Sequence, residues 1–130
     1  AAGRFWCGNL TLLCHLTGTA FQPDLRGGVL LIEDQGEAPY RIDRMLTHMR
    51  LAGCFDGLVG LALGSFTNCG GIDTIGRIVA DRLGGLGIPI VGGFDVGHAQ
   101  VNLTVPVGLP VQLDADMGRL TFNQSALHPI

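Results

Sequence analysis

Serine is scarce in this chain, which has only Ser65 and Ser125 among its 130 residues. Neither lies in the Gly-x-Ser-x-Gly turn that presents a nucleophile between a strand and a helix, which argues against a self-contained serine hydrolase. The four cysteines form no CxxC pair and show no spacing typical of a zinc site. We therefore expect free, buried thiols in a reducing compartment and no metal centre.

The chain also lacks an excess of basic charge, nucleotide-binding motifs and long apolar runs. Eight Lys and Arg stand against eleven Asp and Glu, for a net charge of −3, which argues against nucleic-acid binding. No Gly-x-Gly-x-x-Gly follows a predicted strand and no Walker-type Gly-Lys-Ser/Thr occurs, so nucleotide binding has no support. No apolar stretch reaches the ~18 residues of a membrane helix, and nothing resembles a signal peptide.

The residues that are present suit one domain spanning 1–130. Hydrophobic residues make up 47% of the chain and charged residues 15%, which is enough apolar material for a core and too much for a disordered tail. The 21 glycines stand mostly between apolar runs and indicate short elements joined by tight turns. The first residue is Ala1 and not Met, so we expect a processed product, an excised domain or a fragment of a longer protein.

Buried strands and amphipathic helices alternate in the first two thirds of the chain. Runs without polar alternation predict strands at 28–32, 58–63 and 88–91. Helices are predicted after an N-cap at Asn9, from Pro39 to just before Gly53, and over 72–84.

The pattern changes after residue 100. Alternating apolar and polar residues at 101–105, 111–114 and 120–122 predict a meander of small antiparallel strands. The predicted fold class is therefore α/β, with a β-α-β-α-β portion, a mixed sheet and a C-terminal antiparallel meander.

Acidic residues follow the first predicted strand. Glu33 and Asp34 end that strand, and Glu37 comes three residues after Asp34. A carboxylate at the end of a buried strand is partly desolvated, which suits an orienting or acid–base role. Alternatively, Asp34 or Glu37 simply caps the following helix, because helix N-termini attract acids.

His98 is the histidine with the most informative position. It lies between Gly97 and Ala99 in the loop after the third predicted strand, with Asp95 nearby. Histidine can take and return a proton near neutral pH, so His98 is a candidate general base. A solvated loop histidine without a role is the alternative. His48, on the polar face of a helix, and His128, near the C-terminus, are expected to be inert.

Five short segments occur in order along the chain: Gly8-Asn9-Leu10, Leu31-Ile32-Glu33-Asp34, Pro39-Tyr40-Arg41-Ile42-Asp43-Arg44, Gly64-Ser65-Phe66 and Gly97-His98. At these spacings they resemble the C-terminal domain of the LD-carboxypeptidases. That family comprises the muramoyltetrapeptide carboxypeptidases and the related microcin C immunity proteins. The resemblance covers nearly the whole chain, from Gly3 to about Phe122.

The resemblance implies a swivelling β/β/α-type domain from a serine peptidase whose Ser-Glu-His triad is divided between two domains. The family's acid falls on Glu33 and its histidine on His98. Its serine belongs to an N-terminal domain that this chain lacks, so we expect the chain alone to be inactive. Asn9 lies in a segment that resembles one bordering the family's cleft, so Asn9 is expected to contact the substrate. Cys7 stands where the family more often has glycine.

The implied reaction removes the terminal D-alanine, bound to an L-centre, from cytoplasmic muropeptide tetrapeptides in peptidoglycan recycling. It needs neither a metal nor an organic cofactor. The expected partners are the peptide substrate, the missing N-terminal domain and, for the full-length protein, a second copy. Three alternatives stay open: a microcin C-type immunity peptidase, a stand-alone non-catalytic binding module of the same fold, and a phosphohistidine carrier by fold analogy.

Overall fold

A six-stranded mixed sheet organises the computed structural model, which describes residues 1–127. In chain order the elements are β1 (Ala2–Asn9), α1 (Leu10–Leu16), β2 (Gly28–Gln35), α2 (Pro39–Leu51), β3 (Gly60–Thr67), α3 (Ile72–Leu83), the 3₁₀ helix η1 (Gly84–Leu86), β4 (Ile90–Gly92), β5 (Pro110–Asp114) and β6 (Arg119–Phe122). The strands lie in the order β4-β3-β2-β1-β5-β6. β1 to β4 are parallel, whereas β5 and β6 are antiparallel to their neighbours.

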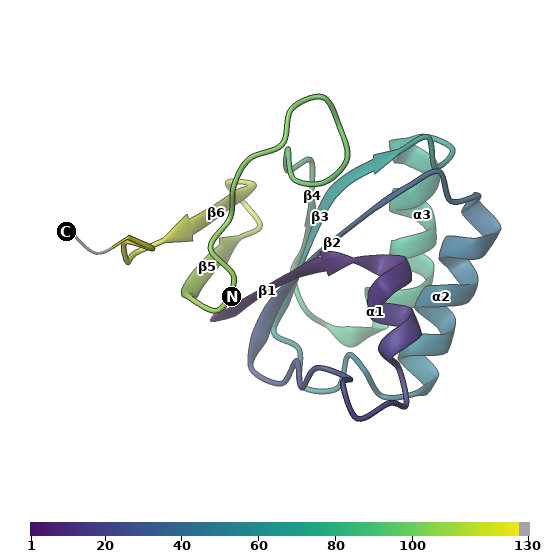
Figure 1. Cartoon of the computed structure of the whole chain (residues 1–130), viewed down its shortest axis with the longest axis horizontal. Helices are drawn as coiled ribbons and strands as arrows, with labels where there is room; N and C mark the ends of the chain where they lie inside the picture. Colours follow the sequence, from purple (N-terminus) through teal and green to yellow (C-terminus); the bar gives the residue numbers. More distant parts are fainter. Residues whose placement is uncertain (128–130) are drawn as a thin grey trace.

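The sheet is covered on both faces by different kinds of structure. The three α-helices lie together on one face of the parallel strands (Figure 1). The long loop between β4 and β5 lies on the opposite side, towards which the sheet continues into β5 and β6 (Figure 1). The continuous apolar run of β2 follows from this arrangement. Leu30 and Ile32 pack on the helical side, while Val29 and Leu31 pack on the opposite side, and all four are fully buried. Each such side chain contributes about 1.5–3 kcal/mol by leaving water.

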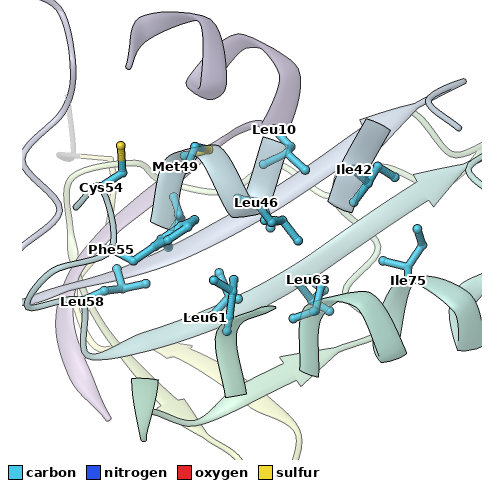
Figure 2. Packing of buried hydrophobic residues seen from close by; sticks show 14 of the residues in the cluster. Leu10, Ile42, Leu46, Met49, Cys54, Phe55, Leu58, Leu61, Leu63 and Ile75 are labelled. Atoms are coloured by element: carbon cyan, nitrogen blue, oxygen red, sulfur yellow. The ribbon is translucent and has the colours of Figure 1, made fainter. Parts of the chain in front are cut away.

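The larger core lies between the sheet and the helices (Figure 2). Ile42 and Leu46 of α2 and Ile75 of α3 meet Leu61 and Leu63 of β3 in one buried cluster. These helical residues belong to the apolar stripes that the sequence predicts, so the helical periodicity does reflect burial. A smaller cluster on the other face contains Val96 from the β4–β5 loop and thereby ties that loop to the sheet.

The predicted helix boundaries are confirmed at three positions. The Asn9 side-chain oxygen accepts a hydrogen bond from the Leu12 N–H at 3.1 Å and caps α1. Pro39 occupies the first turn of α2, where its missing N–H costs nothing. Gly53, which follows the C-cap Ala52 of α2, has a φ of 75°, a conformation that glycine adopts without strain. No helix within residues 1–127 combines the length and hydropathy needed to cross a bilayer.

Two sequence predictions about strands need correction. Residues 2–9 form a long strand, β1, that pairs with both β2 and β5, so the parallel portion begins one strand earlier than predicted. Residues 101–105 form no strand. β1 already has neighbours on both sides, and the Leu103 N–H instead donates to the Asp95 carbonyl at 2.7 Å. The predicted meander is therefore the single hairpin of β5 and β6.

Candidate active site

Glu33 lies at the carboxyl end of β2, on the face opposite the helices. Its side chain is only 7% exposed, and a buried carboxylate is costly unless partners compensate for its lost hydration. Both carboxylate oxygens have such partners. Oε1 accepts a hydrogen bond from Asn9 Nδ2 at 3.2 Å, and Oε2 lies 2.7 Å from His98 Nδ1.

His98 is therefore paired with Glu33, although 65 residues separate them along the chain. The imidazole is 53% exposed, and no residue among 1–127 bonds to its Nε2. The buried acid thus holds one ring nitrogen while the other is open to an incoming group. This is the geometry of a carboxylate-oriented general base.

The pair also sets the protonation of the imidazole. Glu33 raises the pKa of His98, mainly through the hydrogen bond and then through its negative charge, and the charge of Asp34 adds to the effect. In the neutral ring, the bond to Glu33 favours a proton on Nδ1 and leaves the Nε2 lone pair free. After Nε2 takes a proton, the same carboxylate stabilises the imidazolium.

Asp34 has a structural role instead. Its carboxylate accepts hydrogen bonds from the Thr11 N–H at 2.9 Å, the Thr11 hydroxyl at 2.8 Å, the Gln35 N–H at 2.8 Å and Asn9 Nδ2 at 3.1 Å. These bonds join the end of β2 to the first turn of α1, where a negative charge is favourable. Asp34 is 3% exposed, and these donors compensate for the hydration that its carboxylate loses.

The alternative that Asp34 or Glu37 caps the following helix is wrong. The N-cap of α2 is Ala38, which makes no side-chain capping bond. Glu37 instead pairs with Arg41 one turn later, with Oε2 2.8 Å from Nε. Asp34 does support a helix N-terminus, but the helix is α1, which precedes β2 in the chain.

Asn9 connects the two carboxylates. Its Nδ2 donates to Glu33 and Asp34, and its Oδ1 accepts from Leu12. The parallel pairing of β1 with β2 places Asn9 directly opposite Glu33, and sequence reasoning missed this link because it did not predict β1 as a strand. The expected contact of Asn9 with substrate stays a prediction.

Two glycines allow the His98 loop to approach Glu33 closely. Gly97 has a φ of 131°, and a Cβ there would lie 2.4 Å from Ser65 Oγ and 2.7 Å from Glu33 Oε2. A Cβ at Gly64 would lie 2.3 Å from the Val96 carbonyl oxygen. A side chain at Gly64 would have to move the loop backbone, and one at Gly97 would displace the Ser65 and Glu33 side chains besides straining the backbone, so glycine at both is a condition for the Glu33–His98 contact.

The other sequence candidates lie apart from this pair or serve local contacts. The Ser65 hydroxyl donates to the Val96 carbonyl at 3.3 Å, and the Ser125 hydroxyl donates to the Leu127 carbonyl. His48 is exposed on α2, and His128 lies outside the described residues. The four cysteines are free, with Cys54 and Cys69 buried and the other two half-buried. Within residues 1–127, no three His, Cys, Asp or Glu side chains are grouped to hold a metal ion.

Replacing Glu33 with glutamine is expected to lower the pKa of His98 towards the ordinary value of about 6.5. Glutamine keeps the shape of the side chain but removes the negative charge that stabilises the imidazolium. Titration of the His98 ring by NMR measures the change. Glu37→Gln is the matched control, because that carboxylate pairs with Arg41, and it should leave the His98 titration unchanged. An unaltered midpoint in Glu33→Gln would contradict the pairing.

The same pair makes stability depend on pH in a defined direction. Because the folded pKa of His98 is raised, its contribution to stability is fully present below the unfolded pKa of about 6.5. That contribution is lost as the pH rises through the raised folded value, and Glu33→Gln should remove it.

Fold and site together define a mixed α/β domain that presents a histidine supported by a buried carboxylate. Comparison with known proteins identifies the family. The model of the LD-carboxypeptidase C-terminal domain matches residues 2–113. The chain belongs to this family.

Named relatives agree with this assignment. A Synechocystis protein named as a carboxypeptidase is 46% identical over 127 residues, which is 94% of this chain and 42% of that protein. The self-immunity protein MccF for microcin C7 from Escherichia coli is 30% identical over 129 residues, which is 96% of this chain and 38% of MccF. The chain thus spans about two fifths of the length of these relatives.

A solved structure confirms the architecture. The muramoyltetrapeptide carboxypeptidase from Oxalobacter formigenes superposes with a TM-score of 0.80 at 34% identity, covering 92% of this chain and 44% of that protein. The curled mixed sheet with three helices is therefore the fold of this carboxypeptidase family.

Proposed function

We propose that this chain supplies the acid and the base of a serine LD-carboxypeptidase that removes the terminal D-alanine from muropeptide tetrapeptides. The proposal includes the cytoplasmic, peptidoglycan-recycling setting of that reaction and a nucleophile domain as the partner of this chain. The observation that carries it is the 2.7 Å contact between Glu33 Oε2 and His98 Nδ1, with the opposite ring nitrogen open. The muramoyltetrapeptide carboxypeptidase relative supports the choice of substrate.

In the first half of the proposed reaction, His98 Nε2 takes the proton of the partner domain's serine hydroxyl as the serine oxygen attacks the scissile carbonyl carbon. Glu33 remains ionised, holds the ring and stabilises the imidazolium. The tetrahedral intermediate then collapses as the bond to D-alanine breaks. His98 gives its proton to the leaving amine, and the rest of the peptide remains bound to the serine as an ester.

The second half repeats the same proton transfers with water. His98 takes a proton from a water molecule whose oxygen attacks the ester carbonyl, and then returns the proton to the serine oxygen as the ester breaks. The products are the shortened peptide, with a new carboxylate, and the regenerated enzyme. The chain's own residues thus transfer protons at Nε2 and hold the ring through Nδ1.

The test measures release of D-alanine from a muropeptide tetrapeptide. This chain alone is expected to release none, because Ser65 and Ser125 are both engaged in local contacts. A longer protein, made by joining the amino-terminal part of the Synechocystis relative to this chain, is expected to release D-alanine. Release by the chain alone would contradict the assignment of the serine nucleophile to a partner domain. A folded but inactive longer protein would contradict the peptidase proposal.

A microcin C-type immunity peptidase is the second candidate, favoured by the 30% identity to MccF over nearly the whole chain. The same longer protein distinguishes the two functions when it is given a peptide–nucleotide substrate and a muropeptide tetrapeptide in parallel. Faster cleavage of the peptide–nucleotide would favour the second candidate.

A further inference from the structure

His98 lies in a segment that has no secondary structure to hold it. Residues 93–109 connect β4 to β5 without a helix or a strand, and the connection appears as the long green loop in Figure 1. In strands and helices, repeated backbone hydrogen bonds fix each residue. In this segment, the position of the imidazole depends on a few individual contacts.

One set of contacts fixes the residue two positions before His98. The Val96 carbonyl accepts hydrogen bonds from the Ser65 N–H at 2.8 Å and from the Ser65 hydroxyl at 3.3 Å. The Val96 side chain is 7% exposed and belongs to the apolar cluster on that face of the sheet. These contacts attach the loop to β3 through the carbonyl of the Val96–Gly97 peptide group.

The residue between Val96 and His98 is Gly97, whose conformation is the least restricted of any residue type. Its N–H donates to the side-chain oxygen Oδ1 of Asn102 at 3.0 Å. A second bond closes the same loop, from the Leu103 N–H to the Asp95 carbonyl at 2.7 Å. Asn102 therefore holds the N–H of the same Val96–Gly97 peptide group whose carbonyl Ser65 holds, so this peptide group is fixed at both ends.

We propose that Asn102 is a positioning residue for His98. Its carboxamide fixes the N–H end of the Val96–Gly97 peptide group, and thereby the direction in which the chain leaves this group and carries the His98 ring towards Glu33. Without this acceptor, the Val96–Gly97 peptide group would keep only its bonds to Ser65, and the loop would carry the imidazole away from the carboxylate for part of the time. The geometric part of this inference depends only on the observed Glu33–His98 contact, whereas its effect on rate rests on the proposed peptidase function.

The charged groups that act on His98 are Glu33, which contacts the ring, and Asp34, which lies beyond it. Asn102 itself is uncharged. Its removal therefore changes the His98 titration only by changing the position of the ring relative to these two carboxylates. A residue that merely completes the loop would not alter this titration.

The experiment is an NMR titration of His98 in this chain and in three variants. Asn102→Ala removes the acceptor, and the pKa of His98 is expected to fall towards the ordinary value of about 6.5. Asn102→Asp keeps an acceptor oxygen and adds a negative charge, so the pKa is expected to stay raised or to rise further. Gln100→Ala alters an exposed residue of the same loop and is expected to leave the titration unchanged.

An unchanged His98 titration in Asn102→Ala would overturn the proposal, as would an equal fall in the aspartate variant. Hydrogen exchange of the unmodified chain adds a measurement that needs no variant. The Gly97 amide is expected to be protected, and exchange as fast as in an open loop would contradict the hydrogen bond to Asn102.

Kinetics in the longer protein test the consequence for the rate. Asn102→Ala is expected to lower kcat by roughly 10- to 100-fold, with little change in KM, because small misplacement of a catalytic group is costly. A rise in KM with kcat unchanged would instead indicate a substrate-binding role. If the unmodified longer protein has no peptidase activity, the proposed function fails while the titration still decides the role of Asn102.

Discussion

Replacing His98 with alanine is expected to lower kcat/KM for D-alanine release by about 10³- to 10⁶-fold in the longer protein that carries a serine nucleophile. The loss is large because a serine hydroxyl is a poor nucleophile until a base removes its proton, and the leaving amine needs the same proton returned. The buried Glu33 carboxylate holds Nδ1 of His98 and leaves Nε2 open to an incoming group. Alanine at this position leaves no group to take its place.

His48→Ala is the matched control for this prediction. His48 is exposed on α2, so its removal should leave both the rate and the fold unchanged. The measurement is initial-rate D-alanine release over a range of tetrapeptide concentrations. Activity in His98→Ala within tenfold of the unmodified protein would show that another group supplies the base.

Glu33 and His98 are expected to act as one unit. When a residue works only through another, removing both costs little more than removing one. A Glu33→Gln substitution made on top of His98→Ala should therefore have little additional effect.

Replacing Gly64 with alanine is expected to destabilise the fold and to separate His98 from Glu33. The new Cβ would lie 2.3 Å from the Val96 carbonyl oxygen, 3.1 Å from Leu31 Cδ2 and 3.2 Å from Glu33 Cβ. The closest of these atoms is backbone, so it cannot rotate away as a side chain can. Overpacking of this kind costs about 1–3 kcal/mol, and relief requires the His98 loop to lift from β3.

Urea unfolding and the His98 titration test the two consequences of Gly64→Ala together. Both the midpoint of unfolding and the pKa of His98 should fall. Gly92→Ala in the adjacent strand β4 is the control, because a Cβ there would meet Leu63 at an ordinary 3.7 Å. An alanine at 64 that leaves both quantities unchanged would mean that the loop does not rest on β3 as described.

Most helices and the buried strands could be predicted from the sequence, because their signals are local. The stripe on α2, its start at Pro39 and its end before Gly53 all depend on residues within a few positions of one another. The long strand β1 was harder to predict, since its sequence carries glycine, arginine and asparagine among its apolar residues. Its strand character comes from neighbours on both sides in the sheet.

At residues 101–105 the sequence predicts a strand that the structure does not contain. Their alternation is typical of a strand, yet Val101 and Leu103 are 55% and 59% exposed, and the segment pairs with none of the six strands. An alternating pattern predicts which side chains share a face, but pairing also needs a partner with free backbone groups. That partner is decided by the order of the strands, which local residues do not specify.

The sequence by itself determined the candidates: a carboxylate at the end of a buried strand, and a histidine between small residues after another strand. Local patterns suffice for this because strand ends and glycine turns are read from neighbouring residues. Residue patterns left Glu33, Asp34 and Glu37 open as the acid and the family resemblance pointed to Glu33, but only the tertiary structure shows which of them contacts the histidine. The order β3-β2-β1 places Glu33 beside both the His98 loop and Asn9, whereas Asp34 takes donors from α1 and Glu37 pairs along α2. Residues so far apart in the chain meet because the sheet aligns the carboxyl ends of parallel strands, and no local pattern contains that alignment.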